Sequence, residues 1–196
     1  GVDAAALAQH LFSGDRFLGN TAAYDDPRNS YLNDVLDRHL GIPISLTVVM
    51  MEIGRRVGVP IVGVGMPGHF LARDARDPEA YFDPFTGPDR IDERGCRDRF
   101  RASAGEGAPW HPAFLAPVGP SEIVIRMLTN LQQGAVAQDL PSAIDLVDRH
   151  LEGPGHLLGV AADGGLIHAQ LAGGVLAGAQ PYQAVEAAQD LDADDH

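Results

Sequence analysis

Lysine is absent from this 196-residue sequence, in which all 14 basic residues are arginine. That absence excludes Schiff-base chemistry on a lysine amine, a phosphate-binding loop of the P-loop type and self-crosslinking through lysine side chains. Positive charge is also scarce, because 27 acidic residues give a formal net charge of -13 at pH 7. A protein with that charge repels polyanions, so we expect neither nucleic acid nor an anionic membrane surface as a partner.

Cysteine is almost absent too, since Cys96 is the single thiol. No internal disulfide can form, which is typical of a reducing compartment. The sequence has no apolar run of roughly 18 residues and no charged-then-apolar leader, so we predict a cytoplasmic protein. The eight histidines show no paired metal-ligand spacing, and the glycines form no nucleotide-binding fingerprint. We therefore predict no metal and no cofactor.

The hydrophobic residues that are present, 45% of the chain, are enough for one compact core with a helical appendage. Periodic apolar residues predict a helix over 3–12, and a second helix that starts after the Asp26-Pro27 turn signal and ends at Gly41. A third helix is expected from Pro43, whose missing N–H is harmless in a first turn, to about residue 57.

Short β-branched and aromatic runs predict buried strands over residues 59–66, 69–73 and 80–85, with a polar turn between the last two. Residues 86–120 are rich in Arg, Asp, Gly and Pro and predict a long surface excursion. Beyond this, four apolar-periodic segments predict helices in two pairs, over 121–138, 142–151, 164–178 and 181–191.

Five short motifs occur in order between Tyr24 and Gly87: PRNSYLNDVL, GIPISL, RRVGVP, PGHFL and YFDPFTG. In these motifs the chain resembles the SirB-type family of bacterial transglutaminase-like proteins. The resemblance implies an α+β fold with a transglutaminase-like (papain-like) core over residues 1–118, followed by a helical, tetratricopeptide-like segment over 119–196. It also implies a site of the Cys, His, Asp type, with the cysteine at the N-terminus of a core helix.

Two members of that triad have counterparts here, His69 and Asp83. They lie fourteen residues apart, at the opening of one predicted strand and near the end of the next. A hairpin would bring them side by side, with the carboxylate orienting the imidazole. The alternative is a buried imidazole that contacts a turn carboxylate and stabilises the hairpin without any chemical role.

The nucleophile has no such counterpart. The expected cysteine position, counted back from the end of the helix, falls on Pro43, which has no reactive atom. Ser45 could replace it, but two residues along a helix is a rotation of about 200°. Ser45 could equally be a first-turn serine that caps a backbone N–H. Cys96 follows His69 and Asp83 and sits in a predicted loop among arginines that could lower its pKa; its alternative is an exposed bystander thiol.

Three polar residues upstream of the helix complete the candidate site. An amide of Asn29 or Asn33 could donate to an oxyanion, whereas the common role of such residues is to fix a turn or cap a helix. Arg28 could pair with a substrate carboxylate, although an internal pair with a neighbouring aspartate is the more ordinary role.

Two functions of different class follow from these residues. In the first, the protein is an acyl-transfer enzyme or amide hydrolase that acts on a small amide or amine substrate, with a Ser45, His69, Asp83 arrangement. In the second, it is a catalytically degenerate transglutaminase fold that binds a peptide or protein segment. The C-terminal helices would then offer a surface for a partner or a homo-oligomer, and the acidic charge favours basic partners.

Overall fold

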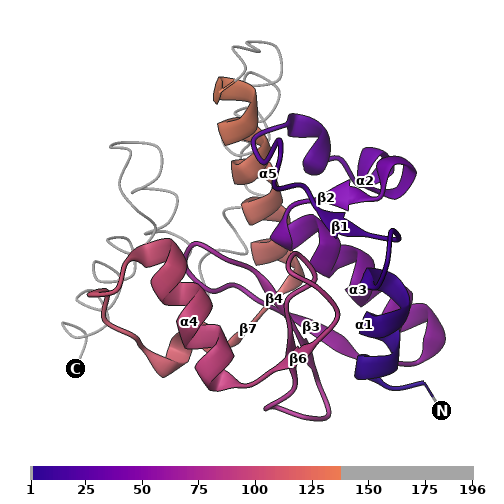
Figure 1. Ribbon diagram of the computed structural model, residues 1–196, viewed down its shortest axis with the longest axis vertical. Helices are drawn as coiled ribbons and strands as arrows, with labels where there is room; N and C mark the ends of the chain where they lie inside the picture. The colour runs from indigo at the N-terminus through magenta and orange to yellow at the C-terminus, as the bar shows by residue number, and fades with distance from the viewer. Residues whose placement is uncertain (1, 138–196) are drawn as a thin grey trace.

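The computed structural model describes residues 2–137 of the chain (Figure 1). Its helices are α1 (Ala4–Phe12), α2 (Leu32–Arg38), α3 (Pro43–Val57), α4 (Glu93–Ala104) and α5 (Pro120–Ala137), with the 3-10 turns η1 (Pro27–Asn29) and η2 (Pro112–Leu115). Its strands are β1 (Leu18–Gly19), β2 (Leu40–Gly41), β3 (Ile61–Val64), β4 (Leu71–Asp74), β5 (Tyr81–Phe82), β6 (Arg90–Ile91) and β7 (Pro117–Val118).

The central sheet is antiparallel, with strand order β6-β5-β4-β3-β7, and β1 and β2 form a separate parallel pair. Alternate side chains along a strand point to opposite faces. Leu71 and Tyr81 join the apolar cluster of α4 and η2, whereas Ala72 and Phe82 join the cluster of α1 and α3. The sheet is therefore packed between α3 and α4, which Figure 1 shows on opposite sides of the strands.

Helix α3 has the predicted bounds because both of its ends are specified locally. Pro43 occupies the first helical turn, and Gly58 ends the helix with a left-handed φ of 78°. Leu46 and Met50 are fully buried on its inner face, against the sheet and α1. Val57, at the end of the helix, is 52% exposed.

The end of α2 differs from the prediction. His39, and not Gly41, ends this helix in a left-handed conformation with φ 58°. Gly41 instead lies in β2, where a Cβ would sit 2.7 Å from Oγ of Ser45. The glycine is thus required by the close approach of β2 to the first turn of α3.

The predicted surface excursion over 86–120 is wrong. This segment forms β6, α4, η2 and β7, and β7 pairs with β3 as an edge strand of the central sheet. Its few apolar side chains belong to the core. Cys96 and Phe100, for example, lie one turn apart on α4 and are fully buried. The segment was predicted as a surface loop because its composition is polar and it supplies few residues to the core, namely Cys96, Phe100, Phe114 and Leu115.

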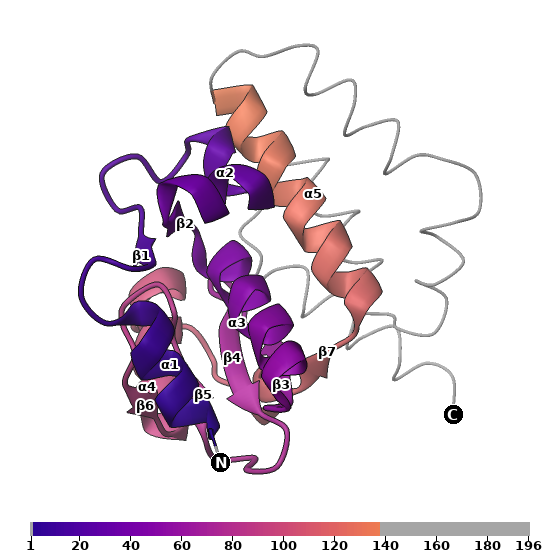
Figure 2. The same cartoon turned by 90° about the vertical axis from the view of Figure 1, so that its right-hand side faces the viewer.

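Helix α5 corresponds to the first of the four predicted C-terminal helices. Ile123 of α5 is buried against Ile42, Ile44 and Phe70, so the helix packs on the opening of α3 (Figure 2). The predicted helices over 142–151, 164–178 and 181–191 lie outside the described residues. Within residues 2–137, none of the helices combines the length and apolarity needed to cross a membrane.

Candidate functional site

His69 and Asp83 meet at one end of the β4–β5 hairpin. The two strands pair Ala72 with Phe82, so His69, two residues before β4, and Asp83, directly after β5, emerge at the same end of the hairpin. Nε2 of His69 lies 3.0 Å from Oδ1 of Asp83, and their side chains are 15% and 1% exposed. Nε2 is at ion-pair distance from the carboxylate but makes no aligned hydrogen bond among the described residues. The spacing argument thus placed the two side chains correctly.

Arg99 of α4 is a third member of this cluster, and sequence reasoning missed it. Its Nε donates to Oδ2 of Asp83 at 2.5 Å. The same guanidinium donates to Oγ1 of Thr86 at 3.0 Å and to the carbonyl of Gly95 at 3.1 Å. Asp83 is therefore held between His69 and Arg99, one on each carboxylate oxygen. The sequence shows several arginines around Cys96. Because no helix was predicted there, it gave no reason to expect that one of them contacts Asp83.

The electrostatics of the cluster keep Asp83 ionised. Burial alone would raise the pKa of this carboxyl, but contact with His69 and the Arg99 guanidinium outweigh burial and lower the pKa to about 2. The backbone N–H of Phe85 also donates to Oδ1 of Asp83, at 3.2 Å. At neutral pH the site thus contains a carboxylate whose charge is already matched by an arginine.

Two aromatic side chains, Phe85 and Tyr24, follow one another beside the imidazole of His69. The ring of Phe85 meets the ring of His69 edge-on at 6.4 Å between centroids, and meets Tyr24 edge-on at 5.8 Å. Tyr24 is 47% exposed, so this pair of aromatic rings reaches the solvent on the Tyr24 side. Burial raises the pKa of Tyr24, and the positive charge of Arg126 on α5 partly offsets this rise.

Ser45 has a structural position in the first turn of α3. Its hydroxyl is fully buried, accepts from the N–H of Ile42 at 3.0 Å, and lies 2.7 Å from the carbonyl of Asn29 and 3.1 Å from that of Ile42. One hydroxyl hydrogen serves one of these carbonyls. No hydrogen bond joins Ser45 to His69 within residues 2–137. This is the capping role that the sequence left open beside the catalytic one.

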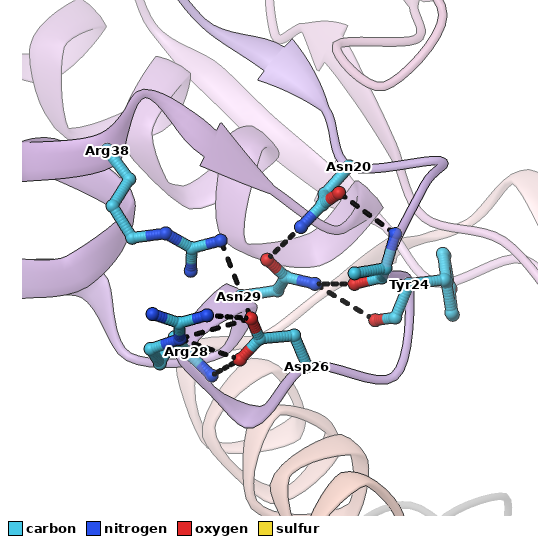
Figure 3. Close-up of polar contacts among 7 residues, drawn as sticks. Asn20, Tyr24, Asp26, Arg28, Asn29 and Arg38 are labelled. Atoms are coloured by element: carbon cyan, nitrogen blue, oxygen red, sulfur yellow. Dashed lines mark hydrogen bonds and ion pairs between the residues drawn. The ribbon is translucent and has the colours of Figure 1, made fainter.

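The Asn29 side chain is also committed to backbone structure (Figure 3). It is fully buried; Nδ2 donates to the carbonyls of Ala23 at 2.7 Å and Tyr24 at 3.0 Å, while Oδ1 accepts from Asn20 at 2.9 Å. Both amide hydrogens have partners, which leaves no donor for an oxyanion. Asn33 is exposed, with its amide 3.4 Å from Asp34.

Arg28 forms the internal pair that the sequence favoured. Its guanidinium binds both oxygens of Asp26, with Nη2 at 2.6 Å, and Arg38 approaches the same carboxylate at 3.6 Å (Figure 3). The Arg28 side chain is 61% exposed, so this pair adds little to stability. Asp26 also caps η1 through the N–H of Arg28.

Cys96 is neither in a loop nor exposed. It lies in α4 with no accessible surface, and burial raises the pKa of its thiol to about 12, although Arg99 acts in the opposite direction. The expectations of a loop position and of a pKa lowered by neighbouring arginines are therefore wrong. A thiol with this pKa stays protonated and inert at neutral pH.

A groove of about 320 Å³ borders the cluster, between loop 12–19 and loop 84–88. Phe85 lines this groove and also contacts the His69 ring, and Thr86 lines it and accepts from Arg99. The loops meet closely at one point, since a Cβ at Gly19 would lie 2.4 Å from the carbonyl of Phe85. The groove and the polar cluster thus share one loop as a common wall.

Comparison with known proteins agrees with this architecture. The family model described as the transglutaminase-like superfamily matches residues 2–129. A UPF0162 protein of Xylella fastidiosa (strain Temecula1) is 43% identical over 131 residues, covering 65% of this chain and 47% of that protein. A UPF0162 protein of Pseudomonas aeruginosa is 38% identical over 107 residues, covering 55% of this chain and 39% of that protein.

F-box only protein 21 of Homo sapiens is 41% identical over 68 residues, or 35% of this chain and 11% of that protein. No solved structure matches. The chain spans about half the length of the Xylella fastidiosa relative. Because the family model covers the whole described core up to the middle of α5, the chain belongs to the transglutaminase-like superfamily.

Proposed function

We propose that this chain is a transglutaminase-like fold that binds an extended peptide or protein segment and has lost the nucleophile of its ancestral site. The observation that carries the proposal is the state of Ser45. Its hydroxyl is fully buried and joins the opening of α3 to the carbonyl of Asn29. A serine that acts as a nucleophile needs access to substrate and a base within hydrogen-bond reach.

The other nucleophile candidates support the same proposal. Pro43 stands where the family resemblance expects cysteine, and a proline ring has no group that can attack. Cys96 is a buried thiol, and its raised pKa keeps it protonated. Asn29 offers no donor to an oxyanion, because both of its amide hydrogens are used by backbone carbonyls.

The groove between loops 12–19 and 84–88 is the proposed binding site. Its lining includes the aromatic rings of Phe12, Phe17 and Phe85, which suit an apolar side chain of a ligand. Asp15, Arg16 and Asp89 adjoin the lining residues in sequence, and the chain carries a net charge of -13. An extended segment with an apolar anchor and flanking basic residues fits this chemistry best.

A peptide-display selection on the purified protein tests the proposal. The expected result is enrichment of peptides with an apolar residue beside Lys or Arg, and loss of their binding in Leu18→Glu, which places a charge on the groove. Val57→Glu is the matched control, since Val57 is also exposed but lies at the far end of α3 and is not among the groove residues. Peptides that bind Leu18→Glu as well as the parent protein would contradict the assigned site.

A hydrolase or acyl transferase is the second candidate, and the 3.0 Å approach of His69 to Asp83 favours it. A fluorophosphonate probe distinguishes the two. Labelling that disappears in both Ser45→Ala and His69→Ala would establish a working serine and end the binding-only proposal. We expect no labelling of the native protein by this probe.

We extend the proposal to the finer family level and to the rest of the chain. Within the superfamily we assign the protein to the SirB type, as a cytoplasmic protein with a papain-like core and tetratricopeptide-like helices after residue 118. Those helices would form a partner or homo-oligomer surface. Light scattering of the full chain, beside a version that ends at residue 137, checks this: a change in oligomeric state supports it, and identical states contradict the homo-oligomer.

A further inference from the structure

The turn that carries His69 is held from a distant part of the chain. Residues 66–69 form a reverse turn in which the N–H of His69 donates to the carbonyl of Met66 at 3.1 Å. Nη2 of Arg126, on α5, donates to that same Met66 carbonyl at 2.8 Å and to the His69 carbonyl at 2.9 Å. One guanidinium nitrogen thus joins both ends of the turn.

The contacts of Arg126 that the described residues show are with carbonyl groups and an aromatic ring. The guanidinium is stacked over the ring of Phe70 at 5.4 Å, and a Cβ at Gly65 would lie 3.4 Å from its Nη1. Burial lowers the pKa of Arg126 to about 10, with the nearby Tyr24 acting in the opposite direction. Two carbonyl dipoles and an aromatic face therefore stabilise a partly buried cation.

This arrangement has a direct consequence for the imidazole. The backbone of His69 is fixed by Arg126, and its ring is placed 3.0 Å from Asp83. The ring position depends on the turn, because His69 lies outside β4 and receives no ladder hydrogen bond from the strand pairing. Since α5 also packs through Ile123 on Ile42 and Ile44, the same helix contacts the opening of α3.

We propose that Arg126 is a positioning residue that sets the 66–69 turn, and with it His69, from α5. The position of α5 and the geometry of the His69 site are then coupled, and a partner that displaces α5 alters the site. Both carbonyls accept from one nitrogen, Nη2, so the contact needs a cationic donor at this point and not the two arms of the guanidinium. The inference rests on the contacts of Arg126 and holds whether or not the groove binds peptide.

The test compares Arg126→Met, Arg126→Lys and the control Val124→Met, which changes an exposed position on the same helix. Amide hydrogen exchange is measured on the intact chain. In Arg126→Met we expect the His69 amide to exchange at least about ten-fold faster, with less than about two-fold change in α1. Arg126→Lys should recover part of this protection, because an ammonium can donate to both carbonyls, and Val124→Met should match the parent protein.

A second readout follows the imidazole itself by NMR. The His69 ring signals should shift in Arg126→Met, while those of His111, whose ring caps the N–H of Ala113 in η2, should not. Exchange that rises equally in α1 and at His69, or a His69 ring unchanged in Arg126→Met, would overturn the positioning role. Neither readout uses a peptide, so failure of the display selection would remove the proposed function and leave this inference standing.

Discussion

At the strand end of the site, side chains are arranged around a buried carboxylate, whereas at the helix end the polar side chains hold backbone groups together. Asp83 lies between His69 and Arg99. Ser45, at the opening of α3, caps Ile42 and contacts Asn29. The polar side chains at the two ends therefore have different partners. The histidine and the carboxylate contact each other and an arginine, whereas the serine contacts the backbone.

The largest effect that sharpens this contrast is expected from Asp83→Ala. It removes the anion from a buried pair and leaves Arg99 without its partner, which costs about 3 kcal/mol of unfolding free energy, the low end for a broken buried pair because Arg99 is 26% exposed. Urea denaturation measures the loss. The control is Glu52→Ala, whose pairs with Arg55 and Arg56 are exposed and predict a much smaller loss.

At the helix end, Ser45→Ala should cost between about 1 and 3 kcal/mol, because it leaves the buried N–H of Ile42 and the carbonyl of Asn29 without a partner. Ser13→Ala, at an exposed serine, should change the unfolding free energy by less than about 0.5 kcal/mol. The same urea titrations supply both numbers. A Ser45→Ala protein as stable as its parent would remove the structural role assigned to this hydroxyl.

Acid should weaken the strand end. The pKa of Asp83 is lowered from 3.8 to about 2 in the folded protein, so the stabilisation is fully present above pH 3.8 and is lost as the pH falls through 2. The shift corresponds to roughly 2 kcal/mol. The difference in unfolding free energy between the parent and Asp83→Asn should shrink by that amount between pH 5 and pH 2. A difference that is independent of pH would show that Asp83 is not held ionised.

The smallest effect concerns Cys96. Burial and a pKa of about 12 predict that dithionitrobenzoate leaves the native thiol unmodified at pH 7.5 over the time in which urea-unfolded protein reacts completely. Stoichiometric reaction of the native protein would mean that α4 opens readily. It would also weaken the view that Arg99 is fixed against Asp83.

The sequence predicted the elements whose ends are marked locally. Pro43 and Gly58 bound α3, and the alternating strands around the polar turn brought His69 and Asp83 together. The membership of a transglutaminase-like family, which the five motifs indicated, is confirmed by the family match over residues 2–129. Local chemistry was sufficient in these cases because each signal lies within a few residues of its effect.

Contacts between distant segments were not predictable in this way. Arg99 reaches Asp83 from a helix whose polar composition resembled a loop, and Arg126 reaches His69 across 57 residues. Neither arginine belongs to a local motif. The burial of Cys96 depended on the same misassigned helix. Tertiary packing, which composition does not encode, determined all three positions.

We propose that Pro43, and not Ser45, occupies the place of the lost nucleophile. The most direct measurement is the alkylation rate of a thiol placed at each position, with the products resolved by peptide mapping. Pro43 is buried, so in Pro43→Cys we expect iodoacetamide to react slowly at pH 6.5 but faster than with Ser45→Cys, and His69→Gln in that background to slow the reaction by about ten-fold, because the imidazole favours the thiolate. A Ser45→Cys thiol that depends on His69, beside a Pro43→Cys thiol that does not, would contradict the account.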